Sequence, residues 1–109
     1  MKTQTKTYVI DIDGTICSTK ILNLVNHEFN YKNAKPIYPM INKINKLYKQ
    51  GNVIIFNTAR LWIDFDITRK WLKRYKVNYH TLVCGKPYGD VYIDDKAVNI
   101  KEFIENENK

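Results

Sequence analysis

The sequence predicts an α/β protein in three layers with a mainly parallel central sheet, and three observations support this fold class. Runs of β-branched and aromatic residues alternate with segments of helical periodicity, as in βαβ units. Polar residues directly follow the apolar runs, which is typical of parallel strands that end at a ligand-binding edge. The length of 109 residues suits one domain, so residues 1–109 are expected to form a single domain.

The predicted first strand, residues 8–10, leads into a pair of carboxylates. Asp11 and Asp13 stand one residue apart, and Gly14 and Thr15 follow them. Two carboxylates at this spacing repel each other unless a cation lies between them, and magnesium prefers oxygen ligands that it shares with a phosphate. The stretch therefore predicts a magnesium site, although an ordinary Asp-Gly turn would have the same sequence. An EF-hand calcium loop is excluded, because Gly14 comes too early and no Glu closes the loop.

Residues 16–36 are expected to form a hairpin or short flap beside Asp11, because this segment is too short for a separate covering domain. His27, in this segment, is interpreted as a solvated side chain. Pro39 then begins a helical pattern that Gly51 ends. The apolar positions of that helix are Met40, Ile41, Ile44, Leu47 and Tyr48.

The continuous apolar run 53–56 predicts a central parallel strand that is buried on both faces. Thr58, Ala59 and Arg60 follow this strand after one intervening residue. Strand, helix and strand together make a βαβ unit, whose connection is expected to be right-handed.

A second helix is predicted to begin within residues 64–68 and to end near Lys76, with apolar residues on one face and basic residues on the other. Trp62 and Phe65, which lie near its start, are interpreted as packing residues rather than as a stacking platform for a ligand. A last helix is predicted over residues 97–105.

The third and fourth strands are predicted over residues 79–84 and 91–93. Lys86 lies in the loop between them, and Asp94 and Asp95 follow the fourth strand. Because the carboxyl ends of parallel strands meet at one edge of a sheet, the polar residues after all four strands are expected to converge on one site.

The composition narrows the classes of function. A net charge of +7 permits attraction to nucleic acid, although the basic face of the second helix is interpreted as a solvated surface. Cys17 and Cys84 are far apart and in no CxxC pattern, which argues against a zinc site and a disulfide scaffold. Neither has an Arg six residues later, as a cysteine-based phosphatase requires. With no signal-like N-terminus and only short apolar runs, we expect a soluble, cytoplasmic protein without a membrane partner.

Four stretches occur in order at the predicted strand ends: Asp11-Ile12-Asp13-Gly14-Thr15, Thr58, Lys86 and Asp94-Asp95. Together they resemble the four motifs of the haloacid dehalogenase superfamily of phosphohydrolases, whose fold is Rossmann-like. Further stretches resemble a small capless branch that includes capsular polysaccharide biosynthesis phosphatases and phage relatives. Those stretches are residues 31–37, Thr58-Ala59-Arg60, Thr68 with Trp71-Leu72, Gly85-Lys86-Pro87 and residues 92–97.

The resemblance implies a role for each residue. Asp11 would attack phosphorus to form an aspartyl-phosphate, and Asp13 would protonate the leaving oxygen and later activate water. For these roles Asp11 must stay ionised, whereas the pKa of Asp13 must be raised by its surroundings. Thr58 would bind the phosphoryl oxygens, and Lys86 would neutralise the nucleophile and the transferring group.

The resemblance also implies the cofactor Mg²⁺ and a substrate-binding set. Magnesium would be held by Asp11, the backbone carbonyl of Asp13, and one or both of Asp94 and Asp95. Thr15 would help to fix the loop. The implied substrate-binding residues are Gly14, Thr15, Ala59 and Arg60. A structural reading of Arg60, as a helix-start residue bonded to backbone, has equal weight.

The absence of a covering domain predicts an open site, which suits a large substrate or a small one enclosed by a second copy of the chain. The favoured function is a magnesium-dependent phosphatase for a phosphorylated metabolite such as a sugar phosphate or nucleotide. The alternative is a nucleic-acid end phosphatase of the polynucleotide kinase-phosphatase type, although that group has Ser-Gly-Arg where this chain has Thr58-Ala59-Arg60. An alternative of another class is a non-catalytic phospho-acceptor or binding module.

Overall fold

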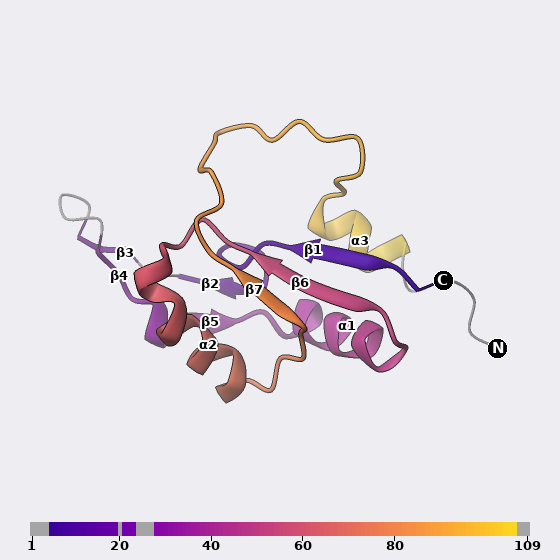
Figure 1. Ribbon diagram of the computed structural model, residues 1–109, viewed down its shortest axis with the longest axis horizontal. Coiled ribbons are helices and arrows are strands. Elements are labelled where there is room, and N and C mark those ends of the chain that lie inside the picture. The colour runs from indigo at the N-terminus through magenta and orange to yellow at the C-terminus, as the bar shows by residue number, and fades with distance from the viewer. Residues whose placement is uncertain (1–4, 20, 24–27, 107–109) are drawn as a thin grey trace.

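The structure is a computed structural model that describes residues 5–19, 21–23 and 28–106. Figure 1 shows a sheet in the middle of the molecule with helices packed around it and a small flap at one end. The strands are β1 (Thr7–Ile10), β2 (Cys17–Ser18), β3 (Ile21–Asn23), β4 (Glu28–Phe29), β5 (Lys35–Pro36), β6 (Val53–Asn57) and β7 (Thr81–Val83). The helices are α1 (Tyr38–Lys49), α2 (Phe65–Arg74) and α3 (Ile100–Asn106), with 3₁₀ turns η1 (Tyr31–Asn33) and η2 (Trp62–Asp64).

The central sheet is parallel and has the order β1-β6-β7. Ile10 pairs with Phe56, and Asn57 pairs with Val83, so the three strands end at a common edge. The predicted α/β class with a mainly parallel sheet flanked by helices is therefore confirmed, and so is the prediction that polar loops follow the first three strands at one edge.

Helix α1 connects β1 to β6 through the flap, and its sequence explains its bounds. Pro39 lies in the first turn, where its missing N–H costs no helical hydrogen bond. Gly51 follows the helix with a φ of 92°, a conformation that glycine adopts without strain. The predicted helix is confirmed. Of its five predicted apolar residues, Tyr48 is partly buried and packs against the core. The other four are buried in the core: Met40, Ile41, Ile44 and Leu47.

The two faces of the sheet differ in burial. Ile54 and Phe56 of β6 are fully buried in the core with residues of α1 and α2, whereas Val53 and Ile55 on the other face are only half-buried. On that same face Val9 of β1 is 62% exposed. The prediction that β6 is buried on both faces is thus wrong, because no element among the described residues covers its second face fully.

Helix α2 covers the buried face beside β6 and β7, with Trp71 and Leu72 in the core. Its predicted bounds hold to within two residues. Phe65, the first residue of α2, packs against the core as predicted, whereas Trp62 is 58% exposed and stacks on Phe65 outside the core. In the described part of the chain, no helix has the length and apolar character that crossing a bilayer requires.

The flap is built from two short antiparallel pairs, β2 with β5 and β3 with β4. Its base is tied to the fold, since Ala34 is buried and its carbonyl accepts a hydrogen bond of 2.9 Å from the indole N–H of Trp71. The segment predicted as a hairpin or short flap, residues 16–36, holds these two antiparallel pairs in the part that the structure describes. His27 lies outside the described residues.

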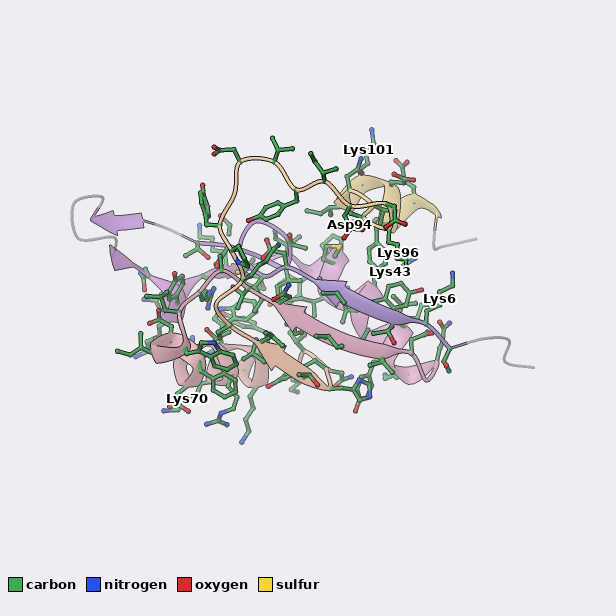
Figure 2. The ribbon with its side chains drawn as sticks, turned by 45° about the horizontal axis from the view of Figure 1, so that its top comes forward. Lys6, Lys43, Lys70, Asp94, Lys96 and Lys101 are labelled. Carbon is green, nitrogen blue, oxygen red and sulfur yellow. The ribbon has the colours of Figure 1, made fainter. Side chains whose placement is uncertain are left out.

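The predicted fourth strand is wrong. Residues 91–93 form no strand, and Val91 and Ile93 are 75% and 96% exposed. The loop folds on itself instead, because the Tyr92 hydroxyl donates to the carbonyl of Pro87 and accepts from the N–H of Gly89, each at 2.8 Å. In Figure 1 this segment arches away from β1 before α3 begins, and Figure 2 shows Asp94 and Lys96 near the start of α3.

Candidate functional site

The site begins at the tight turn after β1. Ile12 is fully buried, and its carbonyl accepts hydrogen bonds from the N–H groups of Thr15 and Ile16 at 3.0 and 2.9 Å. Gly14 adopts a φ of 79°, which allows the chain to reverse here. Because Ile12 anchors the turn in the core, the carboxylates on either side of it are held at the end of the sheet.

Lys86 is brought to Asp11 by the backbone of two neighbouring loops. Its N–H donates to the carbonyl of Thr58 at 2.9 Å, and the N–H of Gly85 donates to the carbonyl of Arg60 at 2.8 Å. The Lys86 Nζ then lies 4.0 Å from Asp11 Oδ1. The residues after β1, β6 and β7 therefore converge, as the sequence predicts for Asp11, Thr58 and Lys86.

Thr58 occupies the position directly after β6 and is fully buried. Its N–H donates to the carbonyl of Val83 at 2.9 Å, and its hydroxyl oxygen accepts a bond of 3.1 Å from the N–H of Arg60. These bonds place the hydroxyl inside the loop, bonded to backbone. Ala59 is half-buried in the same loop.

Arg60 is paired with Asp13, which the sequence analysis does not anticipate. Its Nε and Nη2 donate to the two carboxylate oxygens of Asp13 at 2.9 and 2.7 Å, a bidentate arrangement. The Arg60 side chain is only 1% exposed, against 35% for Asp13. In the structure the Arg60 guanidinium contacts Asp13 and is buried, and the expected contact of Arg60 with substrate stays a prediction. Arg60 is not a helix-start residue bonded to backbone.

Four further residues surround the Arg60–Asp13 pair. The Thr19 hydroxyl donates to Asp13 Oδ1, and Cys17 Sγ lies 3.7 Å from both Asp13 Oδ1 and Arg60 Nη2. Arg60 Nη1 donates to the Thr68 hydroxyl at 3.0 Å. The ring of Tyr31 lies 3.9 Å from the guanidinium carbon. Tyr31 and Thr68 fall in the stretches that carry the narrower family resemblance, which is the one sequence signal that marks them.

The two aspartates differ in electrostatics. Burial raises the pKa of Asp11, and the nearby Asp13 charge adds to this, although the backbone N–H of Ile12 and the Lys86 charge oppose it. Burial would also raise the pKa of Asp13, but the hydrogen bonds and charge of Arg60 outweigh it and lower that pKa. These directions are the reverse of those that the implied roles require, because burial outweighs the Lys86 charge at Asp11 whereas the bidentate Arg60 outweighs burial at Asp13.

Lys86 has a second contact that fixes its direction. Its Nζ lies 4.4 Å from the centre of the Tyr92 ring, which places the ammonium between an aromatic face and the Asp11 carboxylate. The same Tyr92 closes the loop through its hydroxyl. Tyr92 thereby positions Lys86.

Asp94 and Asp95 do not join the other carboxylates. Both lie on the exposed segment, and the Asp94 carboxylate accepts a hydrogen bond of 2.8 Å from the N–H of Lys96. Among residues 5–19, 21–23 and 28–106, no three His, Cys, Asp or Glu side chains are grouped closely enough to hold a metal ion. Since the Asp13 carboxylate is taken up by Arg60, the Asp11 carboxylate and the Asp13 carbonyl are the implied magnesium donors that remain at this edge.

The chain matches no protein-family model and no curated protein. It resembles a crystal structure of an MCSG target from Vibrio cholerae with a TM-score of 0.73 and 27% identity, over 93% of this chain and 89% of that one. Two structures of the Pnkp1/Rnl/Hen1 complex, one titled an RNA repair complex, match at TM-scores of 0.63 and 0.59 with 18% and 21% identity. These two matches include 94% and 92% of this chain but only 30% and 34% of the chains in the complex. The likeness therefore shows a shared fold.

Proposed function

We propose that this protein is a phosphohydrolase of the haloacid dehalogenase type, which cleaves a phosphomonoester through an aspartyl-phosphate. The observation that carries the proposal is the placement of Lys86 Nζ 4.0 Å from Asp11 at the common end of β1, β6 and β7. A carboxylate with an ammonium group beside it suits attack on phosphorus, because the cation balances the charge that gathers on the transferring oxygens.

The residues of the chain divide the work as follows. Asp11 forms the bond to phosphorus while the bond to the leaving oxygen breaks, and Lys86 stabilises the charge on the phosphoryl group. Arg60 holds the Asp13 carboxylate in a fixed orientation two residues away. From there Asp13, in its protonated form, gives its proton to the leaving oxygen, and the resulting carboxylate takes a proton from the water that displaces Asp11 from phosphorus. The Arg60 pair lowers the pKa of Asp13, so the first of these steps works against that pair.

Magnesium dependence is part of the proposal, although the four acids do not form a metal site in this arrangement. The ground for it is donor chemistry, because Mg²⁺ is commonly held by one or two carboxylates together with substrate phosphate and water. Asp11, half-exposed at the end of β1, is the carboxylate with such access.

The first test is phosphate release from an aryl phosphate with magnesium and with a chelator. We expect activity with magnesium alone and its loss in Asp11→Asn, while Asp90→Asn, an exposed acid outside the site, serves as the matched control. Full activity of Asp11→Asn would contradict the proposal. Stable phosphorylation of Asp11 without turnover would indicate a phospho-acceptor module instead.

A second test concerns Asp94 and Asp95. If the segment stays where the structure places it, Asp94→Asn and Asp95→Asn will change the magnesium concentration for half-maximal activity by less than about twofold, because neither contacts the ion. A rise of roughly tenfold in either variant would support the sequence-based prediction that one or both of these acids hold magnesium.

A nucleic-acid end phosphatase is the second candidate, favoured by the shared fold with chains of an RNA repair complex and by the net charge of +7. Hydrolysis of 3′-phosphorylated oligonucleotides would be compared with hydrolysis of a metabolite panel at two salt concentrations. An end phosphatase should prefer the oligonucleotide and weaken as salt rises. Equal or better hydrolysis of the metabolites at both salt concentrations would exclude this candidate.

A further inference from the structure

An exposed apolar group lies at the edge of the proposed site, in the turn that leads into α2. Leu61, Trp62 and Ile63 are consecutive and all exposed, and Trp62 is 58% exposed. Tryptophan is rarely left this open, because its ring gains much from removal from water. An open indole beside a candidate active site therefore indicates a surface that a ligand covers.

The indole of Trp62 is held in one position by its neighbours. Its ring stacks on Phe65 at a centroid distance of 5.7 Å and an angle of 20°, and Phe65 packs against the core. On its edge it meets Gly85, where an added Cβ would lie 3.1 Å from the indole Nε1 and 3.4 Å from Cδ1. Gly85 also has a φ of 82°, so a glycine there permits both the backbone turn and the approach of the ring.

The contact with Gly85 places the indole next to the catalytic loop. Gly85 immediately precedes Lys86, and its N–H donates to the carbonyl of Arg60. Lys86 in turn reaches Asp11. Trp62 therefore flanks the loop that carries Lys86, and a phosphate held between Lys86 and Asp11 would lie at the same loop.

Charge continues beyond the indole along α2. The exposed residues Arg69, Lys70, Lys73 and Arg74 follow on that helix, and Figure 2 shows Lys70 on its outer side. A recess of about 360 Å³ lies there, lined by Lys32, Asp66, Ile67, Lys70, Trp71 and Arg74. Asp66 pairs with Arg69 and Lys70 at 2.7 and 3.1 Å, which balances part of this charge.

We propose that Trp62 stacks on a nucleobase of the substrate, so that the substrate class is a nucleobase-bearing phosphomonoester. This inference rests on the proposed phosphatase function, because the base is located by a phosphate at Asp11 and Lys86. Stacking tolerates every base, since each has a planar face. The phosphate can belong to a free nucleotide or to the phosphorylated end of a strand, two sources of the same chemistry.

The test compares a nucleoside monophosphate with ribose 5-phosphate, which lacks the base. We expect kcat/KM to favour the nucleotide by roughly tenfold in the unaltered protein, the effect of one stacked base. Trp62→Leu, which keeps an apolar side chain beside Gly85 and Phe65, should abolish this ratio. Trp62→Phe should retain much of it, and Ile63→Ala, an equally exposed neighbour, should leave it intact.

Two outcomes would overturn the inference: a ratio near one in the unaltered protein, or a ratio that survives Trp62→Leu. Both differ from failure of the phosphatase proposal, in which neither substrate is hydrolysed. If neither substrate is hydrolysed, the inference is tested by binding, measured as quenching of indole fluorescence by adenosine monophosphate. Trp71 is buried, so we expect quenching in Asp11→Asn and its loss in Asp11→Asn with Trp62→Phe. Quenching that persists without Trp62 would also overturn the inference.

The two sources of the base are separated by a strand substrate. A 3′-phosphorylated oligonucleotide that lies along α2 should lose roughly tenfold in kcat/KM between low and moderate salt, and Lys70→Ala with Lys73→Ala should weaken it further. The free nucleotide should be insensitive to that pair of changes. An oligonucleotide that reacts no better than the free nucleotide, with no effect of the lysines, would assign the site to free nucleotides.

Discussion

Two regions of the molecule carry the residues that the sequence predicts for one site, and they differ in how they are held. The edge formed by β1, β6 and β7 has buried anchors and tied loops, with Ile12 and Thr58 fully buried. The segment 87–99 is exposed over nearly its whole length and is closed mainly by Tyr92. The difference shows that carboxylates are located by the buried residues next to them, and the acids at 94 and 95 have no such neighbours.

The open side of β1 makes this contrast sharper. β1 pairs only with β6 in the described sheet, and Val9 beside its free edge is exposed. Val91 and Ile93 are exposed as well. The exposed apolar segment 91–93 and the unpaired edge of β1 could pair with each other, so the effect of changing residues 91–93 tests whether they do.

The largest expected effect compares two isoleucines. Ile12→Ala should lower the free energy of unfolding by about 2–5 kcal/mol, because it leaves a cavity under the turn that holds Asp11 and Asp13. Ile93→Ala, at a side chain that is 96% exposed, should change it by less than about 0.5 kcal/mol. Urea denaturation measures both. A large loss in Ile93→Ala would show that residues 91–93 are packed in solution, and would remove the contrast between the two regions.

The next effect concerns the buried ion pair. Arg60→Met should destabilise the protein by about 2 kcal/mol, less than for a fully enclosed pair, because Asp13 is partly exposed and regains water. The matched control is Arg69→Met, which removes a solvent-exposed pair with Asp66 and should leave stability nearly unchanged. Thermal and urea denaturation measure both variants. Equal losses of stability in Arg60→Met and Arg69→Met would mean that the Arg60–Asp13 pair does not stabilise this edge of the sheet.

A smaller effect joins the two regions through Tyr92. Tyr92→Leu removes the ring beside Lys86 and the hydroxyl that closes the loop, and should lower kcat by roughly fivefold if the ring contributes about 1 kcal/mol. Tyr92→Phe keeps the ring and should retain more of the activity. Unchanged kcat in Tyr92→Leu would show that Lys86 is held by its backbone bond to Thr58 alone.

The smallest effect is the pH dependence of stability. The folded pKa of Asp11 lies above its ordinary value of 3.8, so its ionised form costs stability at neutral pH and this cost disappears below the ordinary pKa. Asp11→Asn should therefore raise Tm at pH 7 and have little effect near pH 3.5. Asp13, whose folded pKa is lowered, should behave oppositely: Asp13→Asn should lower Tm at pH 7, and less so as pH falls below 3.8. Parallel shifts of Tm in the two variants would contradict these assignments.

The parts of the site that the sequence predicts are those set by local structure. An apolar run followed closely by Asp11, Thr58 or Lys86 predicts each near a strand end, and the prediction holds where the run pairs in the central sheet. The same pattern at 91–93 forms no strand. The helix α1 and the flap were predictable for the same reason, since periodicity and Pro39 or Gly51 act within a few residues.

The sequence by itself determined the order of β1, α1, β6, α2, β7 and α3, the sheet edge and the three loops that meet there. Tertiary structure decided what these loops contact: that Arg60 turns inward to Asp13, that Trp62 remains open against Gly85, and that the Val-Tyr-Ile segment at 91–93 stays away from β1. The physical reason is that each depends on the partner available in space. The Arg60 guanidinium binds the carboxylate that lies nearest to it, and the Trp62 indole fits against Gly85, where no side chain blocks it. An apolar segment forms a strand only where it pairs with the edge of a sheet.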